Sequence, residues 1–145
     1  MRLPVSMNSG PIILVEDDPE DVEIFNEILK GLAVSNKVIQ FPRPEDAYHY
    51  LVSSPEQPFV IISDVNLPGM SGLEFKKKLD AHDALRKKSI PFIFYSTSSE
   101  KKFVLEAYLH LTVQGFFRKG NSYPEIRDQL KTIFEYWKIC QHPNK

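Results

Sequence analysis

Five polar side chains stand where four apolar segments of this chain end. They are Glu16, Asp17, Asp64, Ser96 and Lys119. Each segment is a short, continuous apolar run rich in Ile, Val or Phe, and such runs are typical of strands buried on both faces of a parallel sheet. In open parallel sheets, ligands bind beyond the carboxyl ends of the strands, where the strand order reverses. We therefore expect the carboxylates, the hydroxyl and the amine to converge on one site.

Glu16 and Asp17 form a carboxylate pair that is predicted to bind a cation. Two unit charges about 4 Å apart repel by roughly 4 kcal/mol at an effective dielectric constant of about 20, and Asp64 nearby adds to the repulsion. Such a cluster stays fully ionised only when a cation occupies it, because otherwise one acid keeps its proton. Carboxylate oxygens with open positions suit Mg²⁺, and the sequence has no cluster of His or Cys that would compete for a transition metal.

Strand and helix signals alternate five times along the chain, which favours an α/β fold with a parallel sheet. The strands are predicted at residues 11–15, 37–41, 59–63, 91–95 and 115–118. The first helix is predicted from Pro19 through Leu32, with Gly31 and Asn36 marking its exit. The others are predicted from Pro44 to Val52, from Leu73 to near Asp83, from a cap at Ser98 or Ser99 to Leu111, and from a cap at Ser122 to Trp137.

Charged and capping residues support these helix boundaries. Asp18 is predicted to cap the first helix ahead of Pro19, and Ser122 with Glu125 forms a capping box for the last. We interpret four acids as favourable charge at the start of the first helix: Asp18, Glu20, Asp21 and Glu23. We interpret the lysines at 76–78 and 101–102 as solvated surface charge.

Length and composition indicate one globular domain. The chain has 145 residues, of which 42% are hydrophobic and 26% charged, enough for one core. A net charge of -1 gives no electrostatic footprint for nucleic acid or an anionic membrane. One cysteine, Cys140, excludes an internal disulfide, and neither a signal peptide nor an apolar run of about 20 residues is present. We expect a soluble, cytoplasmic protein.

Four segments, in their order and spacing, resemble the receiver domain of bacterial two-component response regulators. They are Ile13–Asp18, Ile62–Gly72, Pro91–Ser96 and Phe116–Lys119. The resemblance covers residues 10–140 and implies a flavodoxin-like fold, with a doubly wound five-stranded parallel sheet in the order 2-1-3-4-5 flanked by five helices. It is similar to the single-domain, chemotaxis-regulator type, so we expect short flexible tails at 1–9 and 141–145 and no output domain.

The resemblance implies that Asp64 is the phosphoacceptor. Mg²⁺, with Mn²⁺ as an alternative, is then bound by Asp17 directly and by Glu16 through water, together with Asp64 and the backbone carbonyl of Asn66. Taken alone, Asp64 could instead cap the following turn, but an acid directly after an apolar strand, with a second acidic strand end beside it, favours the nucleophile.

The resemblance also implies that Ser96, Thr97 and Lys119 bind the phosphoryl group, and that Phe116 is the aromatic switch residue. Without it, Lys119 could be a solvated lysine and Phe116 a core residue. Ser96 lies in a run of hydroxyl residues that could all be helix caps, and the spacing from Pro91 in the family pattern selects Ser96.

Three residues depart from the common family pattern. Gly120 replaces the usual proline after the lysine, so we expect a trans bond and a more mobile loop. Thr97 is larger than the usual alanine or glycine and is expected to hinder water or a phosphatase. Phe116 replaces the more frequent tyrosine, so its switching would depend on packing alone.

The implied function is that of a stand-alone receiver that accepts a phosphoryl group from a histidine kinase or a histidine phosphotransfer protein, and that is no enzyme beyond its own phosphorylation and dephosphorylation. A protein target is expected on the face made by the fourth helix, fifth strand and fifth helix, and the chain is expected as a monomer or a phosphorylation-dependent homodimer.

Four other interpretations remain as alternatives. A haloacid-dehalogenase-like phosphatase would need an acid where Asn66 stands, and a nucleotide or flavin binder would need a phosphate-binding loop where residues 16–18 are acidic. A phosphorelay intermediate has the same motifs as a terminal regulator. A degenerate receiver that binds partners without phosphorylation is disfavoured by the intact acid pair, Asp64 and Lys119.

Overall fold

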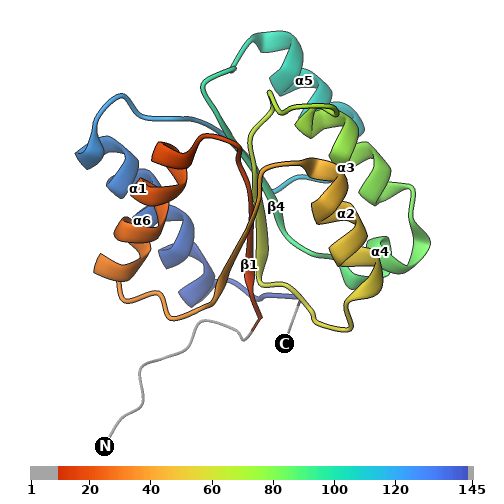
Figure 1. The fold of residues 1–145 in the computed structure, drawn as a ribbon, viewed down its shortest axis with the longest axis horizontal. Coiled ribbons are helices and arrows are strands. Elements are labelled where there is room, and N and C mark those ends of the chain that lie inside the picture. Colours follow the sequence, from red (N-terminus) through yellow and green to blue (C-terminus); the bar gives the residue numbers. More distant parts are fainter. Residues whose placement is uncertain (1–9, 144–145) are drawn as a thin grey trace, which may run out of the picture.

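A parallel sheet with helices on both faces forms the molecule (Figure 1). The computed structural model describes residues 10–143. The strands are β1 (Ile12–Val15), β2 (Val38–Phe41), β3 (Val60–Ser63), β4 (Phe92–Ser96) and β5 (Gly115–Arg118). All neighbouring strands pair in parallel, in the order β2-β1-β3-β4-β5. This order confirms the predicted doubly wound sheet and places its switch point between β1 and β3.

The described residues contain six helices, whereas the sequence predicted five. They are α1 (Pro19–Gly31), α2 (Pro44–Ser53), α3 (Gly72–Asp80), α4 (Asp83–Lys88), α5 (Lys101–His110) and α6 (Tyr123–Ile139). The additional helix is α4, a short segment that begins when His82 Nδ1 accepts the Leu85 N–H at 3.3 Å. It ends at Ser89, which adopts a left-handed conformation with φ of 51°. The predicted fourth and fifth helices are therefore α5 and α6.

The two faces of the sheet carry separate hydrophobic cores. Alternate side chains of β1 divide between them: Ile12 and Leu14 pack with α1 and α6, and Ile13 and Val15 pack with the helices α2, α3, α4 and α5. Because the central strands are fully buried on both faces, the strand ends are the places where they can present polar groups.

The capping predictions are confirmed in part. The Asp18 side chain accepts hydrogen bonds from the N–H groups of Glu20 and Asp21. Ser122 accepts one from the Glu125 N–H, which is one of the two bonds of the predicted capping box. The prediction of a cap at Ser98 or Ser99 is wrong, because α5 begins after Glu100 and Glu100 makes no side-chain cap bond.

Lys76 was predicted to be solvated, and this prediction is wrong because the residue is buried. It is only 5% exposed, its ammonium lies 2.7 Å from Asp80 Oδ1, and it sits 5.1 Å from the Phe92 ring centroid. Burial lowers the pKa of Lys76, an effect that the Asp80 ion pair opposes. The other lysines of both groups are exposed, as predicted.

The C-terminal segment is packed where a flexible tail was expected. His142 is 4% exposed, stacks on Phe59 at a centroid distance of 4.9 Å, and its Nε2 lies 2.6 Å from the Phe59 carbonyl. The predicted tail at 1–9, and residues 144–145 of the other, lie outside the described residues. Within residues 10–143, no helix is long and apolar enough to span a membrane.

Candidate functional site

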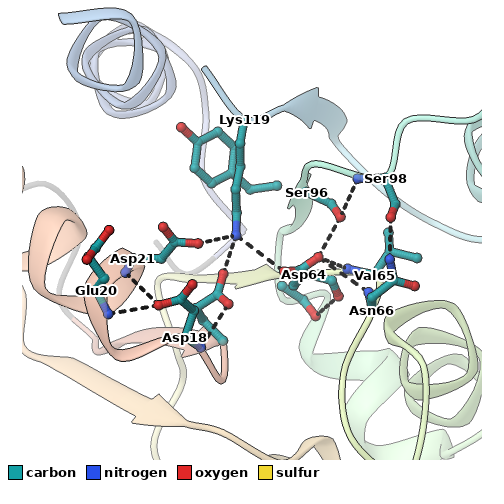
Figure 2. A network of polar contacts seen from close by, with 12 residues as sticks. Asp18, Glu20, Asp21, Asp64, Val65, Asn66, Ser96, Ser98 and Lys119 are labelled. Atoms are coloured by element: carbon teal, nitrogen blue, oxygen red, sulfur yellow. Dashed lines mark hydrogen bonds and ion pairs between the residues drawn. The ribbon is translucent and has the colours of Figure 1, made fainter. Parts of the chain in front are cut away.

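Asp64, Ser96 and Lys119 meet at the carboxyl edge of the sheet, where β3, β4 and β5 end (Figure 2). Glu16 and Asp17, which follow β1, lie beside them. Backbone hydrogen bonds between neighbouring strands fix how far along the sheet these residues lie. The Asp64 N–H donates to the Val15 carbonyl at 3.0 Å, and the Lys119 N–H donates to the Ser96 carbonyl at 2.9 Å. The convergence expected from the four strand ends is therefore present in the structure.

The Asp64 carboxylate has two differently occupied oxygens. Oδ1 accepts from the Val65 N–H at 2.6 Å, the Asn66 N–H at 3.3 Å and the Ser96 hydroxyl at 2.5 Å. Oδ2 lies 3.3 Å from the Lys119 ammonium. Because Oδ1 is saturated with donors while Oδ2 has a single cationic neighbour, Oδ2 is the oxygen available for chemistry.

Lys119 lies among three carboxylates. Its Nζ is 2.5 Å from Glu16 Oε1, 2.9 Å from Asp21 Oδ2 and 3.3 Å from Asp64 Oδ2, and its side chain is 9% exposed. Burial alone lowers the pKa of Lys119, but the ion pairs with Glu16, Asp64 and Asp21 outweigh it and raise the pKa above its ordinary value. The amine therefore stays protonated and carries its charge into the site.

Asp21 is one of the site residues that the sequence interpretation missed. It was assigned to helix N-terminal charge together with Asp18, and for Asp18 the cap confirms that assignment. Asp21 also lies in the first turn of α1, as predicted, and its side chain in addition reaches across to Lys119 (Figure 2). No local signal separates the two acids, because the contact joins residues 98 positions apart.

Glu16, Asp17 and Asp64 together offer three carboxylate oxygens within 4.8 Å of one another. Glu16 is buried and Asp17 is exposed, so one side of the cluster is open to solvent. Burial raises the pKa of Glu16, Lys119 opposes this rise, and the Asp64 charge adds to it. Hard oxygen donors around an open position fit Mg²⁺ or Mn²⁺, and the residues thus fit the predicted ion.

A hydroxyl and amide network supports Ser96. Ser96 Oγ is fully buried, and it accepts the Ser98 N–H at 3.1 Å. The Asn66 side-chain amide in turn donates to Ser98 Oγ. Ser98 therefore orients the site instead of capping a helix. Thr97 is exposed at the end of β4, and the Asn66 carbonyl as a metal ligand stays a prediction.

The loop at Gly120 is held by Gln129 of α6. Gln129 Nε2 donates to the Arg118 carbonyl at 2.6 Å, while Oε1 accepts from the Gly120 N–H at 3.0 Å and the Tyr95 hydroxyl at 2.6 Å. A Cβ at position 120 would lie 2.6 Å from Glu125 Cβ, so a proline has no room there. Two hydrogen bonds thus restrain the start of the loop that was expected to be mobile, and the third connects Gln129 to β4.

Phe116 lies half-buried on β5, with its ring centroid 5.3 Å from that of Phe94. It belongs to the edge of the core that α2, α3, α4 and α5 cover. The position agrees with the simpler interpretation of a core residue, and its switch role stays a prediction.

The sequence model of the response regulator receiver domain matches residues 12–131. The chain belongs to this family. The family and the sheet order are therefore those that the sequence resemblance predicted, and the roles of the individual strand-end residues stay predictions.

Individual relatives are distant in sequence. Over 130 residues the chain is 29% identical to hybrid signal transduction histidine kinase D of Dictyostelium discoideum, a match that covers 86% of the chain. The chain spans only 8% of that kinase's length. It is 25% identical to the response regulator Rcp1 of Synechocystis sp., and the match covers 87% of each protein.

Solved structures of similar proteins agree in fold. The phosphorylated cyanobacterial phytochrome response regulator RcpA superposes with a TM-score of 0.82 at 26% identity, covering 93% of this chain and 99% of RcpA. The Mn²⁺-bound form of Rcp1 gives a TM-score of 0.80 at 25% identity, covering 92% of this chain and 99% of Rcp1.

Proposed function

We propose that the chain is a stand-alone response regulator that accepts a phosphoryl group from a phosphohistidine onto Asp64. The observation that carries this proposal is the arrangement around Asp64. Its Oδ1 is fixed by three donors, its Oδ2 faces a protonated lysine, and two further acids lie beside it.

In the proposed reaction, Asp64 Oδ2 attacks the phosphorus of the phosphohistidine. A P–O bond forms, the P–N bond breaks, and its electron pair stays on the imidazole of the donor. Phosphoryl transfer depends mainly on positioning and on neutralising charge on the equatorial oxygens. Lys119 would supply one positive charge, and Ser96 would turn its hydroxyl from Oδ1 to a phosphoryl oxygen.

The acidic cluster would hold Mg²⁺ through Asp17, Glu16, Asp64 and the Asn66 carbonyl. When bound, the ion neutralises charge on the transferred group and on the carboxylates. The Mn²⁺-bound Rcp1 supports this proposal, since the two chains share the fold over nearly their whole length.

The proposed donors are a histidine kinase or a histidine phosphotransfer protein, and the proposed location is the cytoplasm. We propose that a protein target binds the face made by α5, β5 and α6, and that the chain is a monomer or a phosphorylation-dependent homodimer with no direct nucleic acid binding. Apart from its own phosphorylation and dephosphorylation, no enzymatic activity is proposed.

The test is incubation with Mg²⁺ and acetyl phosphate, followed by intact-mass measurement. We expect a labile gain of one phosphoryl group in the wild type and in Glu23→Gln, which removes an exposed acid of α1. We expect no gain in Asp64→Asn. If the wild type gains nothing while Mg²⁺ binds, the chain is a degenerate receiver, and if Asp64→Asn gains the group at the wild-type rate, the acceptor is a different residue.

A further inference from the structure

Asp21 differs from the other two acids that hold Lys119. Glu16 and Asp64 belong to the carboxylate cluster that could hold a metal ion, and Asp21 does not. Its Oδ2 lies 2.9 Å from Lys119 Nζ, on the α1 side of the ammonium, whereas Asp64 approaches from the β3 side (Figure 2). The lysine is thus held between the reacting carboxylate and an acid outside the reaction.

The contact between Asp21 and Lys119 becomes more important when a cation is bound to the carboxylate cluster. A cation bound to Glu16 and Asp64 offsets their charge and weakens their attraction for the ammonium. Asp21 then remains as the carboxylate that attracts Lys119 without competition from the metal. Phosphoryl oxygens on Asp64 would have to draw the ammonium away from it, since charge-assisted hydrogen bonds to carboxylate and to phosphate are of similar strength.

The restraint acts on the side chain of Lys119, because its backbone is already fixed. The Gln129 hydrogen bonds hold the neighbouring Arg118 carbonyl and the Gly120 N–H. The Lys119 side chain is 9% exposed, whereas that of Asp21 is 36% exposed. Water therefore reaches this ion pair mainly at Asp21, and the attraction is only partly screened.

We propose that Asp21 is a positioning residue that restrains the Lys119 ammonium and competes with the phosphoryl group for it. It thereby slows both the phosphorylation of Asp64 and the hydrolysis of the aspartyl phosphate, because both steps place charge on oxygens that Lys119 stabilises. This inference rests on the proposed function. It concerns a residue that lies three positions after Asp18 and that the sequence identified only as helix N-terminal charge.

The decisive variant is Asp21→Asn, which keeps the size of the side chain and removes its charge. The matched control is Glu20→Gln, because Glu20 is the neighbouring exposed acid in the same helical turn and does not contact Lys119. Both variants change the net charge and the helix N-terminal charge equally. Asp21→Glu serves as the conservative rescue.

With saturating Mg²⁺ and acetyl phosphate, Asp21→Asn should be phosphorylated about three- to tenfold faster than the wild type, which is the scale of one weakened ion pair. Its aspartyl phosphate should hydrolyse faster by a similar factor. In Glu20→Gln and Asp21→Glu, both the phosphorylation rate and the hydrolysis rate should stay within about twofold of the wild-type rates. Unchanged or slower rates in Asp21→Asn, or an equal acceleration in Glu20→Gln, would overturn the proposal.

A second measurement needs no phosphodonor. The ¹⁵Nζ signal of Lys119, identified by its loss in Lys119→Arg, should exchange its protons with water faster in Asp21→Asn than in the wild type or Glu20→Gln. If the wild type accepts no phosphoryl group, the proposed function fails and this signal still tests the restraint. If phosphorylation proceeds but the signal and the rates are the same in all variants, only the role of Asp21 is wrong.

Discussion

At the scale of single residues, the acids at the carboxyl edge of the sheet have distinct surroundings although they are close in sequence. Glu16 is buried against Lys119, Asp17 is exposed, Asp18 caps α1 and Asp21 holds Lys119. Exposure decides what each can do. An exposed carboxylate next to a buried one is accessible to a hydrated ion, and we expect Asp17 to be the direct ligand.

Removing Asp17 should therefore abolish most of the metal affinity and leave the fold intact. We expect Asp17→Ala to bind Mg²⁺ at least about tenfold more weakly, while its unfolding free energy without metal stays equal or rises slightly, since a repelling carboxylate is gone. Calorimetric titration with Mg²⁺ and urea unfolding would measure the two quantities. Glu23→Gln is the control, and equal Mg²⁺ affinity in Asp17→Ala and the wild type would contradict the assignment.

Two of the site residues that the sequence identified, Asp64 and Lys119, share one property: they directly follow apolar strands. Asp64 and Lys119 could be predicted because continuous apolar runs fix where strands end, and parallel strand ends meet. The roles of Asp21, Ser98 and Gln129 could not be predicted, because each contacts a partner that is about 30 residues or more away in the sequence. For Gln129 and Asp21, the helical pattern of the sequence indicates only which face of the helix is buried. Local patterns report the exposure of a side chain but not its tertiary partner.

At the scale of elements, α6 stabilises the backbone next to Lys119 through the side chain of Gln129. One side-chain amide serves the Arg118 carbonyl, the Gly120 N–H and the buried Tyr95 hydroxyl, so it connects the end of β5 with β4. Burial raises the pKa of Tyr95 to about 12, an effect that the nearby Lys119 charge opposes, so the phenol remains a hydrogen-bond donor. The absence of proline at position 120 is thereby compensated by hydrogen bonds.

Replacing Gln129 by methionine should loosen this connection. Gln129→Met keeps the length of the side chain and a good helix former, but leaves the Tyr95 hydroxyl and the loop amide without their partner. We expect a loss of about 1–3 kcal/mol in unfolding free energy. We also expect slower phosphorylation of Asp64, because the backbone on both sides of Lys119 loses its anchor and no longer places the ammonium next to Asp64. Thr132→Ala, on the same helix, is the control for urea unfolding and acetyl phosphate kinetics.

That prediction is contradicted if Gln129→Met unfolds at the wild-type denaturant concentration and is phosphorylated at the wild-type rate. Lower stability with an unchanged rate would show that the loop is held for the fold and not for Lys119.

The segment after α6 is a second element that the fold uses. His142 packs between Phe59 and Trp137, and the Nε2–H donates to the Phe59 carbonyl. Burial lowers the pKa of His142 from its ordinary value of 6.5, and the hydrogen bond partly opposes this. The unfolded chain therefore binds a proton at a higher pH than the folded chain does.

Stability from His142 should consequently be present above about pH 6.5 and be lost as the pH falls below that value toward the lowered folded-state pKa. We expect the wild type to lose more unfolding free energy between pH 7.5 and pH 5.5 than His142→Phe, whose ring stacks but does not titrate. Urea unfolding at several pH values measures this, with the exposed His110→Gln as control. Parallel pH profiles of wild type and His142→Phe would disprove it.

At the scale of the whole molecule, the question is how an event at Asp64 would reach the surface formed by α5, β5 and α6. The connection available in the fold runs along β4 and β5. Ser96 ends β4 at the site, and Phe116 on β5 contacts Phe94 two residues before Ser96. α5 shows three large exposed apolar or aromatic residues to solvent: Leu105, Tyr108 and Leu109.

We expect phosphorylation to change this surface through Ser96 and Phe116. The phosphoryl oxygens would attract the Ser96 hydroxyl from Asp64 Oδ1, and the half-buried Phe116 could then pack more deeply. A charge-assisted hydrogen bond of about 1.5–3 kcal/mol shifts a two-state equilibrium roughly tenfold or more. Amide chemical shifts with and without beryllofluoride should change around Phe116 and along residues 99–111 in the wild type. In Ser96→Ala, which should still accept the group slowly, the changes should be confined to the Asp64 pocket. If the wild type also shows changes only in that pocket, the Ser96 and Phe116 route does not exist.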